Sequence, residues 1–123
     1  MKLKRDLVKY VRDKAKSRYN KKDTCYICGS SKNLDFHHFH GLTELLETWL
    51  KRNKLNINTE QEILDIRNQF IDENYAEVYD ACVTLCHNHH LRLHSIYGKR
   101  PKLITAKKQQ RWVEKQRDKY GMV

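Results

Sequence analysis

The first apolar pattern lies at the start of the chain. Leu3, Leu7, Val11 and Ala15 recur every four residues, and Lys and Arg occupy many of the positions between them. An apolar stripe with this period is typical of one buried helix face. The pattern therefore predicts a basic amphipathic helix over residues 3–19.

Two further helices are predicted in the middle of the chain. Over residues 43–54 apolar side chains recur at helical spacing, and Thr43 is the expected N-cap. Residues 59–73 begin with Thr59-Glu-Gln-Glu62, which matches a capping box followed by an apolar stripe. From 41 to 80 the chain has four basic and nine acidic residues, so this helical pair is acidic.

Two short segments have the composition of strands. Leu34–His38 is apolar and aromatic, and Ala81–Leu85 is rich in β-branched residues. After the second strand, Asn88 is expected to cap a helix that runs towards Gly98, and Thr105 to cap a last basic helix. These elements together predict an α+β fold.

Positive charge is concentrated at the two ends of the chain. Residues 1–24 carry ten Lys and Arg against three Asp and Glu, and residues 95–123 carry nine against two, a net charge of +7 in each. Residues 25–94 have a net charge of −4, within a total of +10 over 123 residues. Basic ends of this kind predict a polyanionic partner, nucleic acid before membrane.

The composition also indicates a compartment. No apolar run approaches the ~20 residues of a membrane span, and the first residues lack the apolar core of a signal peptide. We therefore expect no membrane partner and residence in a cytoplasm. In a reducing cytoplasm, four cysteines with nearby histidines indicate metal before disulfides. A chain of this length has a small core, which often needs such a staple.

Two pairs of residues have the spacing of zinc ligands. Cys25 and Cys28 form a Cys-x2-Cys knuckle, and Cys86 and His89 form a second pair with the same spacing. Zinc takes four sulfur or nitrogen ligands in a tetrahedron, and two pairs on tight turns supply them. The competing candidates for the fourth ligand are His87, His90 and Cys82. Spacing favours His89, and the pattern predicts one structural zinc.

A second group of histidines suggests another metal. His37 and His38 are adjacent on the first predicted strand, while His90 and His94 stand four apart on one face of the following helix. A histidine pair on a helix, taken alone, is usually a pair of surface side chains that bind no metal. A second pair on a strand, before a Cys/His knuckle, favours a metal site instead.

These motifs, taken in order, resemble the HNH endonucleases. The resemblance is carried by Cys25-Tyr-Ile-Cys28-Gly29, then Leu34-Asp-Phe-His37-His38, then Val83-Thr-Leu-Cys86-x2-His89-His90-x3-His94. It implies an α+β fold with a ββα-metal (HNH/His-Me finger) core over residues 25–40 and 80–98, and metal-dependent hydrolysis of phosphodiester bonds.

The resemblance also implies roles for the histidines. His38 corresponds to the general base, and His37, His90 and His94 correspond to the ligands of a catalytic divalent metal, for which Mg, Mn, Ni and Zn are the candidates. A neutral imidazole with a pKa near ~6.5 suits a base that deprotonates water at neutral pH.

The chain departs from the family pattern at two positions. His89 replaces the usual second knuckle cysteine, which is a reasonable exchange for zinc. Ala81 stands where the family has the asparagine that pins the loop holding the base. Positioning of the base must then come from elsewhere, and Asp80 is a candidate.

We therefore predict one HNH nuclease domain over residues 1–123. Its expected parts are a basic N-terminal helix (1–24), the ββα-metal core (25–40 and 80–98), a helical insertion (41–79) and a basic C-terminal helix (99–123). The acidic insertion is a poor surface for DNA, so self-association or a protein partner is expected there. The expected DNA contacts are Arg92, Lys99, Arg100, Lys102, Lys107, Lys108 and Arg111; for Arg92 a merely solvated side chain is an equal alternative.

The predicted function is that of a metal-dependent DNA endonuclease with a structural zinc, of the homing or phage type. The alternatives are a zinc-stapled nucleic-acid-binding module without catalysis and an RNA-directed nuclease of the same fold. Because the C-terminal segment is basic, removal of residues 105–123 should flatten the salt dependence of DNA binding, raise the DNA concentration needed for cutting and leave the metal site assembled.

Overall fold

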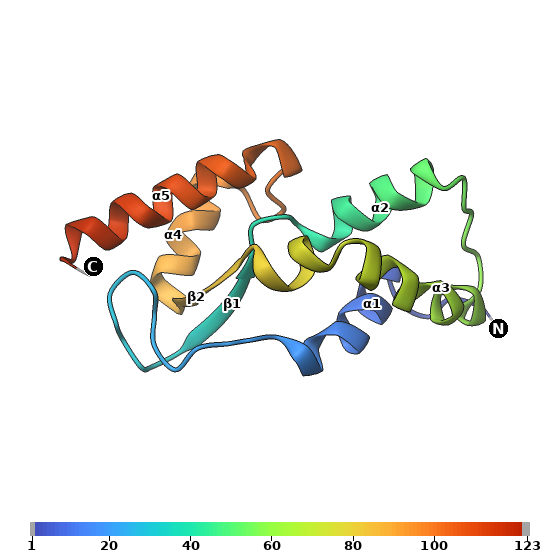
Figure 1. Cartoon of the computed structure of the whole chain (residues 1–123), viewed down its shortest axis with the longest axis horizontal. Helices are drawn as coiled ribbons and strands as arrows, with labels where there is room; N and C mark the ends of the chain where they lie inside the picture. Colours follow the sequence, from blue (N-terminus) through green and yellow to red (C-terminus); the bar gives the residue numbers. More distant parts are fainter. Residues whose placement is uncertain (1, 122–123) are drawn as a thin grey trace.

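The computed structural model describes residues 2–121, which form helices around a small two-stranded sheet (Figure 1). In chain order the elements are α1 (Leu7–Ala15), the 3-10 turn η1 (Lys16–Arg18), β1 (Leu34–His38), α2 (Leu42–Arg52), α3 (Glu60–Glu73), the π-helical turn η2 (Ala76–Asp80), β2 (Cys82–Cys86), α4 (His87–Tyr97), the 3-10 turn η3 (Leu103–Thr105) and α5 (Ala106–Lys119). The fold therefore mixes α and β, as the sequence predicted.

The sheet consists of β1 and β2, paired antiparallel with His38 opposite Cys82. β1 has the predicted bounds, and β2 begins and ends one residue later than predicted. Because successive side chains of a strand point to opposite faces, the two adjacent histidines of β1 face different neighbours. His37 contacts His90 of α4, whereas His38 packs against Tyr19, which follows η1.

Helices α1, α2 and α3 pack around one apolar core. Trp49 of α2 and Phe70 of α3 are fully buried with ring centroids 5.4 Å apart, and Val11 of α1 is buried in the same cluster. The predicted capping box is present, since the Thr59 hydroxyl accepts a hydrogen bond from the backbone N–H of Glu62 at 3.2 Å. Burial of apolar side chains drives this packing.

A second apolar core lies beneath α4 and α5. Leu85 of β2, Leu93 of α4 and Val113 of α5 are buried together with Ile27, which lies between the two knuckle cysteines. Gly98 follows α4 with φ 89°, a conformation that glycine adopts without strain, and so ends the helix where the sequence predicted.

Several predicted helix starts are wrong. The first helix begins at Leu7 instead of residue 3, and Thr43 and Asn88 lie inside the helices they were expected to cap. Thr105 does precede α5, but its hydroxyl donates to the carbonyl of Lys102 instead of capping the helix backbone. A helix starts where the preceding segment delivers the chain. For example, β2 ends at Cys86 and α4 begins at His87 without a loop, so the helix starts before Asn88.

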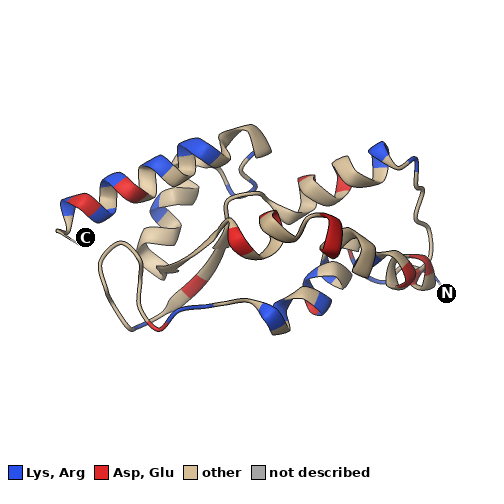
Figure 2. Ribbon diagram, in the orientation of Figure 1, with Lys and Arg blue, Asp and Glu red and all other residues tan. Residues whose placement is uncertain are grey.

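The basic helix α1 packs against the acidic helix α3. Arg67 of α3 donates to the backbone carbonyl of Tyr10 at 3.1 Å, and the Tyr10 hydroxyl donates to Glu60 at 2.9 Å. Figure 2 shows basic residues along α1 and α5 and acidic residues on α3 and η2. The N-terminal helix is therefore not a free arm.

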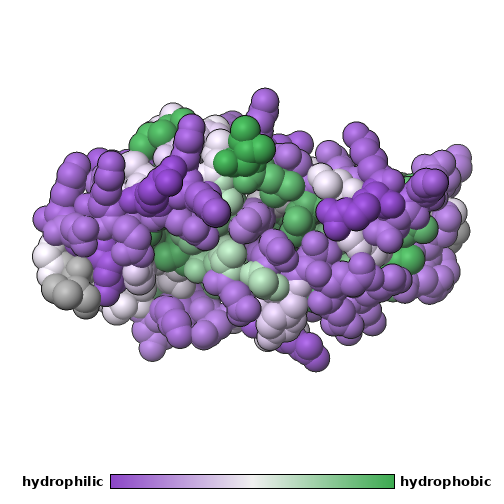
Figure 3. Space-filling view, turned by 45° about the horizontal axis from the view of Figure 1, so that its top comes forward, coloured by the Kyte–Doolittle hydropathy of each residue, from purple (hydrophilic) through white to green (hydrophobic). Residues whose placement is uncertain are grey.

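The outer surface is mostly polar. The face in Figure 3 is largely hydrophilic, with apolar side chains in small groups between charged ones. Among residues 2–121, no helix combines the length and the apolar character needed to cross a membrane.

Candidate active site

The four predicted zinc ligands come together from three parts of the chain. Cys25 and Cys28 lie on a tight turn before β1, Cys86 ends β2, and His89 lies in the first turn of α4. Their ligand atoms all lie within 4.8 Å of one another. Gly29 adopts a φ of 76°, which permits the turn. Its backbone N–H donates to the carbonyl of Cys25 at 2.8 Å.

The distances among these atoms suit a tetrahedral ion. With Zn–S of about 2.3 Å and Zn–N of about 2.1 Å, a tetrahedron has S···S edges of about 3.8 Å and S···N edges of about 3.6 Å. Cys28 Sγ lies 3.9 Å from Cys86 Sγ, and His89 Nδ1 lies 3.1 Å from Cys86 Sγ and 4.0 Å from Cys25 Sγ. This cluster can hold a metal such as zinc.

The thiols show the electrostatic signature of such a cluster. Burial alone raises the pKa of Cys25, but hydrogen bonds from the backbone of Cys86, Cys28 and Ile27 outweigh it and lower that pKa. The pKa of Cys28 is raised to about 11, first by burial and then by its neighbour Cys25. A second thiolate beside the first is unfavourable unless a cation compensates both.

The competing fourth ligands are directed elsewhere. The Cys82 thiol donates to the carbonyl of Val78 at 3.3 Å, and burial raises its pKa to about 12. His87 contacts Asp35 through Nδ1 at 3.0 Å, and His90 belongs to the second histidine group. His89 is the imidazole that completes the cysteine cluster, as its spacing predicted.

The three predicted ligands of the catalytic metal also converge. His37 projects from β1 onto α4, where His90 and His94 stand one turn apart. His90 Nε2 lies 3.2 Å from His37 Nδ1 and 3.0 Å from His94 Nε2. Metal–nitrogen bonds of ~2.1 Å give N···N edges of about 3.0 to 3.4 Å for octahedral or tetrahedral coordination. Both distances from His90 lie in this range, and all three nitrogens lie within 4.8 Å of one another, so the group can hold an ion.

Acceptors on the far side of the rings determine which nitrogens carry protons. His37 Nε2 lies 2.8 Å from the Gln109 side-chain oxygen, His94 Nδ1 lies 2.7 Å from the carbonyl of Gly98, and His90 Nδ1 lies 3.1 Å from Asp35. Each of those acceptors takes an N–H, which leaves a lone pair on the opposite nitrogen. The lone pair of His90 lies 3.0 and 3.2 Å from the other two nitrogens, which is repulsive, and a cation among the three removes that repulsion.

Burial lowers the pKa of two of these imidazoles, His37 and His90. It is the largest cause that lowers the pKa of His37 to about 3, against the opposing hydrogen bond to Gln109. Burial likewise lowers the pKa of His90, although its bond to Asp35 acts the other way. Neutral imidazole is the form that binds metal.

His38 lies in an aromatic niche on the other side of β1. Its ring centroid lies 4.9 Å from that of Tyr19 and 5.2 Å from that of Phe36. Burial lowers its pKa to about 4, a hydrogen bond to the backbone of Val78 opposes this, and the positive charge of Arg12 adds to the lowering. Nε2 is buried without a hydrogen-bond partner in the described chain. That nitrogen is therefore free to accept a proton.

A contact from η2, and not Asp80, holds the His38 ring. Asp80 is exposed, whereas the backbone of Val78, two residues earlier, hydrogen-bonds the imidazole. Ala81, which stands at the position of the family asparagine, ties the strand ends through its backbone: its carbonyl accepts from Phe39 at 3.1 Å. Backbone groups thus hold the His38 ring, where the resemblance to HNH endonucleases implied an asparagine side chain.

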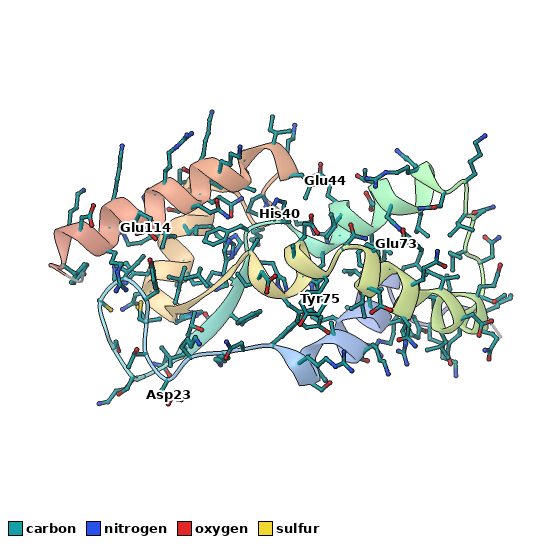
Figure 4. The ribbon with its side chains drawn as sticks, in the orientation of Figure 1. Asp23, His40, Glu44, Glu73, Tyr75 and Glu114 are labelled. Carbon is teal, nitrogen blue, oxygen red and sulfur yellow. The ribbon has the colours of Figure 1, made fainter. Side chains whose placement is uncertain are left out.

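One open cleft of about 730 Å³ joins these residues. It is lined by all four histidines of the second group and by cations from both ends of the chain, namely His37, His38, His90, His94, Lys9, Arg12, Lys99 and Arg100. Three acidic residues, Asp6, Glu44 and Glu47, also line it. The carboxylate of Glu44, labelled in Figure 4, accepts from the backbone N–H of Leu103 at 3.0 Å. The cleft therefore brings four cations, against three carboxylates, to the candidate metal and base.

The predicted DNA contacts are all exposed, but they do not lie together. Lys99 and Arg100 line the cleft, while Arg92 lies on the outer face of α4. The remaining four are on or just before α5: Lys102, Lys107, Lys108 and Arg111. Lys9 and Arg12 of α1 also line the cleft but were not among the predicted DNA contacts. Their spacing of three on a basic helix was the signal that both lie on one face of that helix.

Gln109 is the other residue that the sequence did not reveal. Its side chain is fully buried, contacts His37 and donates to the carbonyl of Phe39 at 3.3 Å and to the Thr105 hydroxyl at 2.9 Å. Helix α5 therefore supports the histidine cluster as well as displaying cations. Removal of residues 105–123 is now expected to disturb the metal site, contrary to the expectation from charge alone.

Comparison with known proteins gives the family. A family model described as the nicking endonuclease family, named after phage T5, matches residues 1–122. The chain belongs to the nicking endonuclease family. No solved structure matched the chain.

Membership in the nicking endonuclease family agrees with the endonuclease that the sequence predicted, and it implies DNA as the substrate. The match covers nearly the whole chain, so α1, the insertion and α5 belong to the family unit together with the histidine cluster.

Proposed function

We propose that this chain is an HNH-type DNA endonuclease that uses a divalent metal and cuts one strand at a time. The observation that carries the proposal is the arrangement in the cleft: His90 Nε2 lies 3.2 Å from His37 Nδ1 and 3.0 Å from His94 Nε2, and His38, whose buried Nε2 has no hydrogen-bond partner in the described chain, is another residue that lines the cleft. A metal site and a free base in one cationic cleft are the parts that phosphodiester hydrolysis requires.

In this proposal the histidines have separate roles. His37, His90 and His94 hold the ion, and His38 Nε2 takes the proton from the attacking water. A divalent ion bound there supplies charge stabilisation for the phosphate and the leaving oxygen. The water oxygen forms the new bond to phosphorus, the bond from phosphorus to the leaving oxygen breaks, and the depressed pKa of His38 keeps it neutral and ready at pH 7.

The donor set narrows the choice of metal. Imidazole nitrogens suit Zn²⁺, Ni²⁺ and, less strongly, Mn²⁺, whereas Mg²⁺ prefers oxygen ligands in an octahedron. We therefore favour a transition-metal ion at the three histidines and a structural zinc at Cys25, Cys28, Cys86 and His89. The ββα unit would then be β1, β2 and α4, with residues 41–79 as an insertion.

The experiment is a plasmid assay with a matched variant. Supercoiled plasmid is incubated with the protein and Mn²⁺, Ni²⁺, Zn²⁺ or Mg²⁺, with and without chelator, beside the His38→Ala and His40→Ala variants. We expect open circles before linear DNA, loss of activity in chelator, and a ~100-fold lower rate for His38→Ala with DNA binding retained, the scale of a lost general base. His40→Ala, two residues along, should stay near the parent rate.

Other outcomes would contradict the proposal. Equal rates for His38→Ala and the parent would remove the base assignment. Cleavage of RNA but not of DNA would indicate an RNA-directed nuclease, and DNA binding without cleavage under any metal would indicate a binding module.

A further inference from the structure

Asp35 connects β1 to two histidines of α4. It precedes His37 by two residues, so both side chains lie on the face of the strand that α4 covers. One oxygen, Oδ2, accepts from Nδ1 of His90 at 3.1 Å and from Nδ1 of His87 at 3.0 Å. No local pattern distinguishes this carboxylate from the other fourteen Asp and Glu residues.

The bond to His90 determines where that imidazole points. With Nδ1–H donating to Asp35, the lone pair on Nε2 is directed at Nε2 of His94, 3.0 Å away, and at Nδ1 of His37, 3.2 Å away. His90 is the middle nitrogen of the three, since its Nε2 makes both of these short distances. A rotation of its ring would therefore separate the whole group.

Asp35 also differs from the partners of the other two rings. Gln109 behind His37 and the Gly98 carbonyl behind His94 are neutral acceptors. Asp35 carries a negative charge, and a carboxylate behind a ligating imidazole fixes its tautomer and increases its basicity. It is thus the one anion among the three acceptors of the histidine group.

We propose that Asp35 is the positioning residue of the histidine group, holding His90 in the orientation and tautomer that bind the catalytic metal. This inference rests on the proposed function of that site. Asp35 acts through His90 and does not contact substrate or the reacting atoms.

The competing explanation is an ordinary surface pair between Asp35 and His87. The His87 side chain is 58% exposed, whereas that of His90 is 22% exposed. Solvent weakens the first contact much more than the second, so the contact with His90 is the stronger of the two. His87→Ala removes the surface pair and leaves the other contact in place, which makes it the matched control.

The test compares the parent with Asp35→Asn, Asp35→Ala and His87→Ala, all with zinc at the cysteine cluster. Calorimetric titration with Ni²⁺ measures binding at the histidines, and His94→Ala marks the signal of that site. We expect Asp35→Ala to weaken Ni²⁺ binding by ~10–100-fold, the usual effect of losing such a partner. The Ni²⁺ affinity of Asp35→Asn should lie between those of the parent and Asp35→Ala, because its amide oxygen still accepts from His90 but lacks the charge. The affinity of His87→Ala should stay within about 2-fold of the parent.

A second measurement needs neither activity nor metal at the histidines. Nitrogen-15 NMR of the rings should show His90 as the Nδ1–H tautomer in the parent and in His87→Ala, and as a mixture in Asp35→Ala. If Asp35→Ala does not fold, Asp35→Asn gives the titration, and the His90 ring signals of the parent then decide the tautomer.

The outcomes separate this inference from the proposed function. Parent-like Ni²⁺ binding with an unchanged His90 tautomer in Asp35→Ala, or an Nε2–H tautomer in the parent, would overturn the role of Asp35. If the parent binds no Ni²⁺ at the histidines, the proposed function fails, and the tautomers still decide whether Asp35 orients His90.

Discussion

The cleft cations make a quantitative prediction about salt. Lys9, Arg12, Lys99 and Arg100 line it, and none of them is in an ion pair among the residues that the structure describes. Each neutralised phosphate contributes about −0.9 to the slope of log affinity against log salt, so four contacts give a slope of about −3.6. Between 50 and 200 mM salt, DNA binding should then weaken by roughly 150-fold.

Substitution of one side of the cleft should halve this dependence. In a Lys9→Ala/Arg12→Ala double variant, two contacts remain, the slope becomes about −1.8, and the same change of salt weakens binding by roughly 12-fold. Fluorescence anisotropy with a labelled duplex measures both slopes, in the His38→Ala background so that the DNA stays intact. The reference is Lys51→Ala/Arg52→Ala, which removes two exposed cations from the last turn of α2.

The comparison of the two double variants decides whether DNA lies in the cleft. We expect the α2 variant to keep the parent slope. An unchanged slope for Lys9→Ala/Arg12→Ala, together with a flatter one for the α2 variant, would place DNA on the insertion and refute the reasoning.

Three further predictions concern folding. Protein purified without added zinc should contain one zinc per chain, and Cys25→Ser should lose both the metal and the fold; elemental analysis that finds less than half an equivalent in a folded parent would contradict this. Gln109→Leu leaves a buried N–H of His37 without its acceptor, which costs about 1–3 kcal/mol; urea unfolding should show a larger loss than for Gln116→Leu, a buried glutamine on the same helix without such a contact. Because burial lowers the pKa of His38 to about 4 from about 6.5 in the unfolded chain, its neutral form stabilises the fold above pH 6.5, and that contribution is lost as the pH falls towards 4. Between pH 6 and 4.5 the free energy of unfolding should therefore fall less steeply in His38→Gln than in the parent. The two slopes should differ by up to ~1.4 kcal/mol per pH unit. Parallel curves would show that the His38 ring is not held in its neutral form by burial.

The sequence by itself determined the parts of the site that local spacing encodes. The Cys-x2-Cys and Cys-x2-His pairs each sit on one turn, and His90 and His94 share a helix face by their spacing of four. The bounds of strand β1 were predicted as observed, from a short apolar and aromatic run, Leu34–His38. The capping box at Thr59 is likewise a contact within four residues.

Only the tertiary structure decided which distant residues support that site. Gln109 lies 72 residues from His37, and Asp35 lies 55 residues from His90, so no local pattern connects them. Charge alone placed the cations at the two ends of the chain. Both terminal helices are packed, because each carries apolar residues that a core must bury: Val11 in one and Val113 in the other. The amino-acid sequence determines how many cations a helix carries. The direction in which they point depends on how the apolar face of the same helix packs against the core.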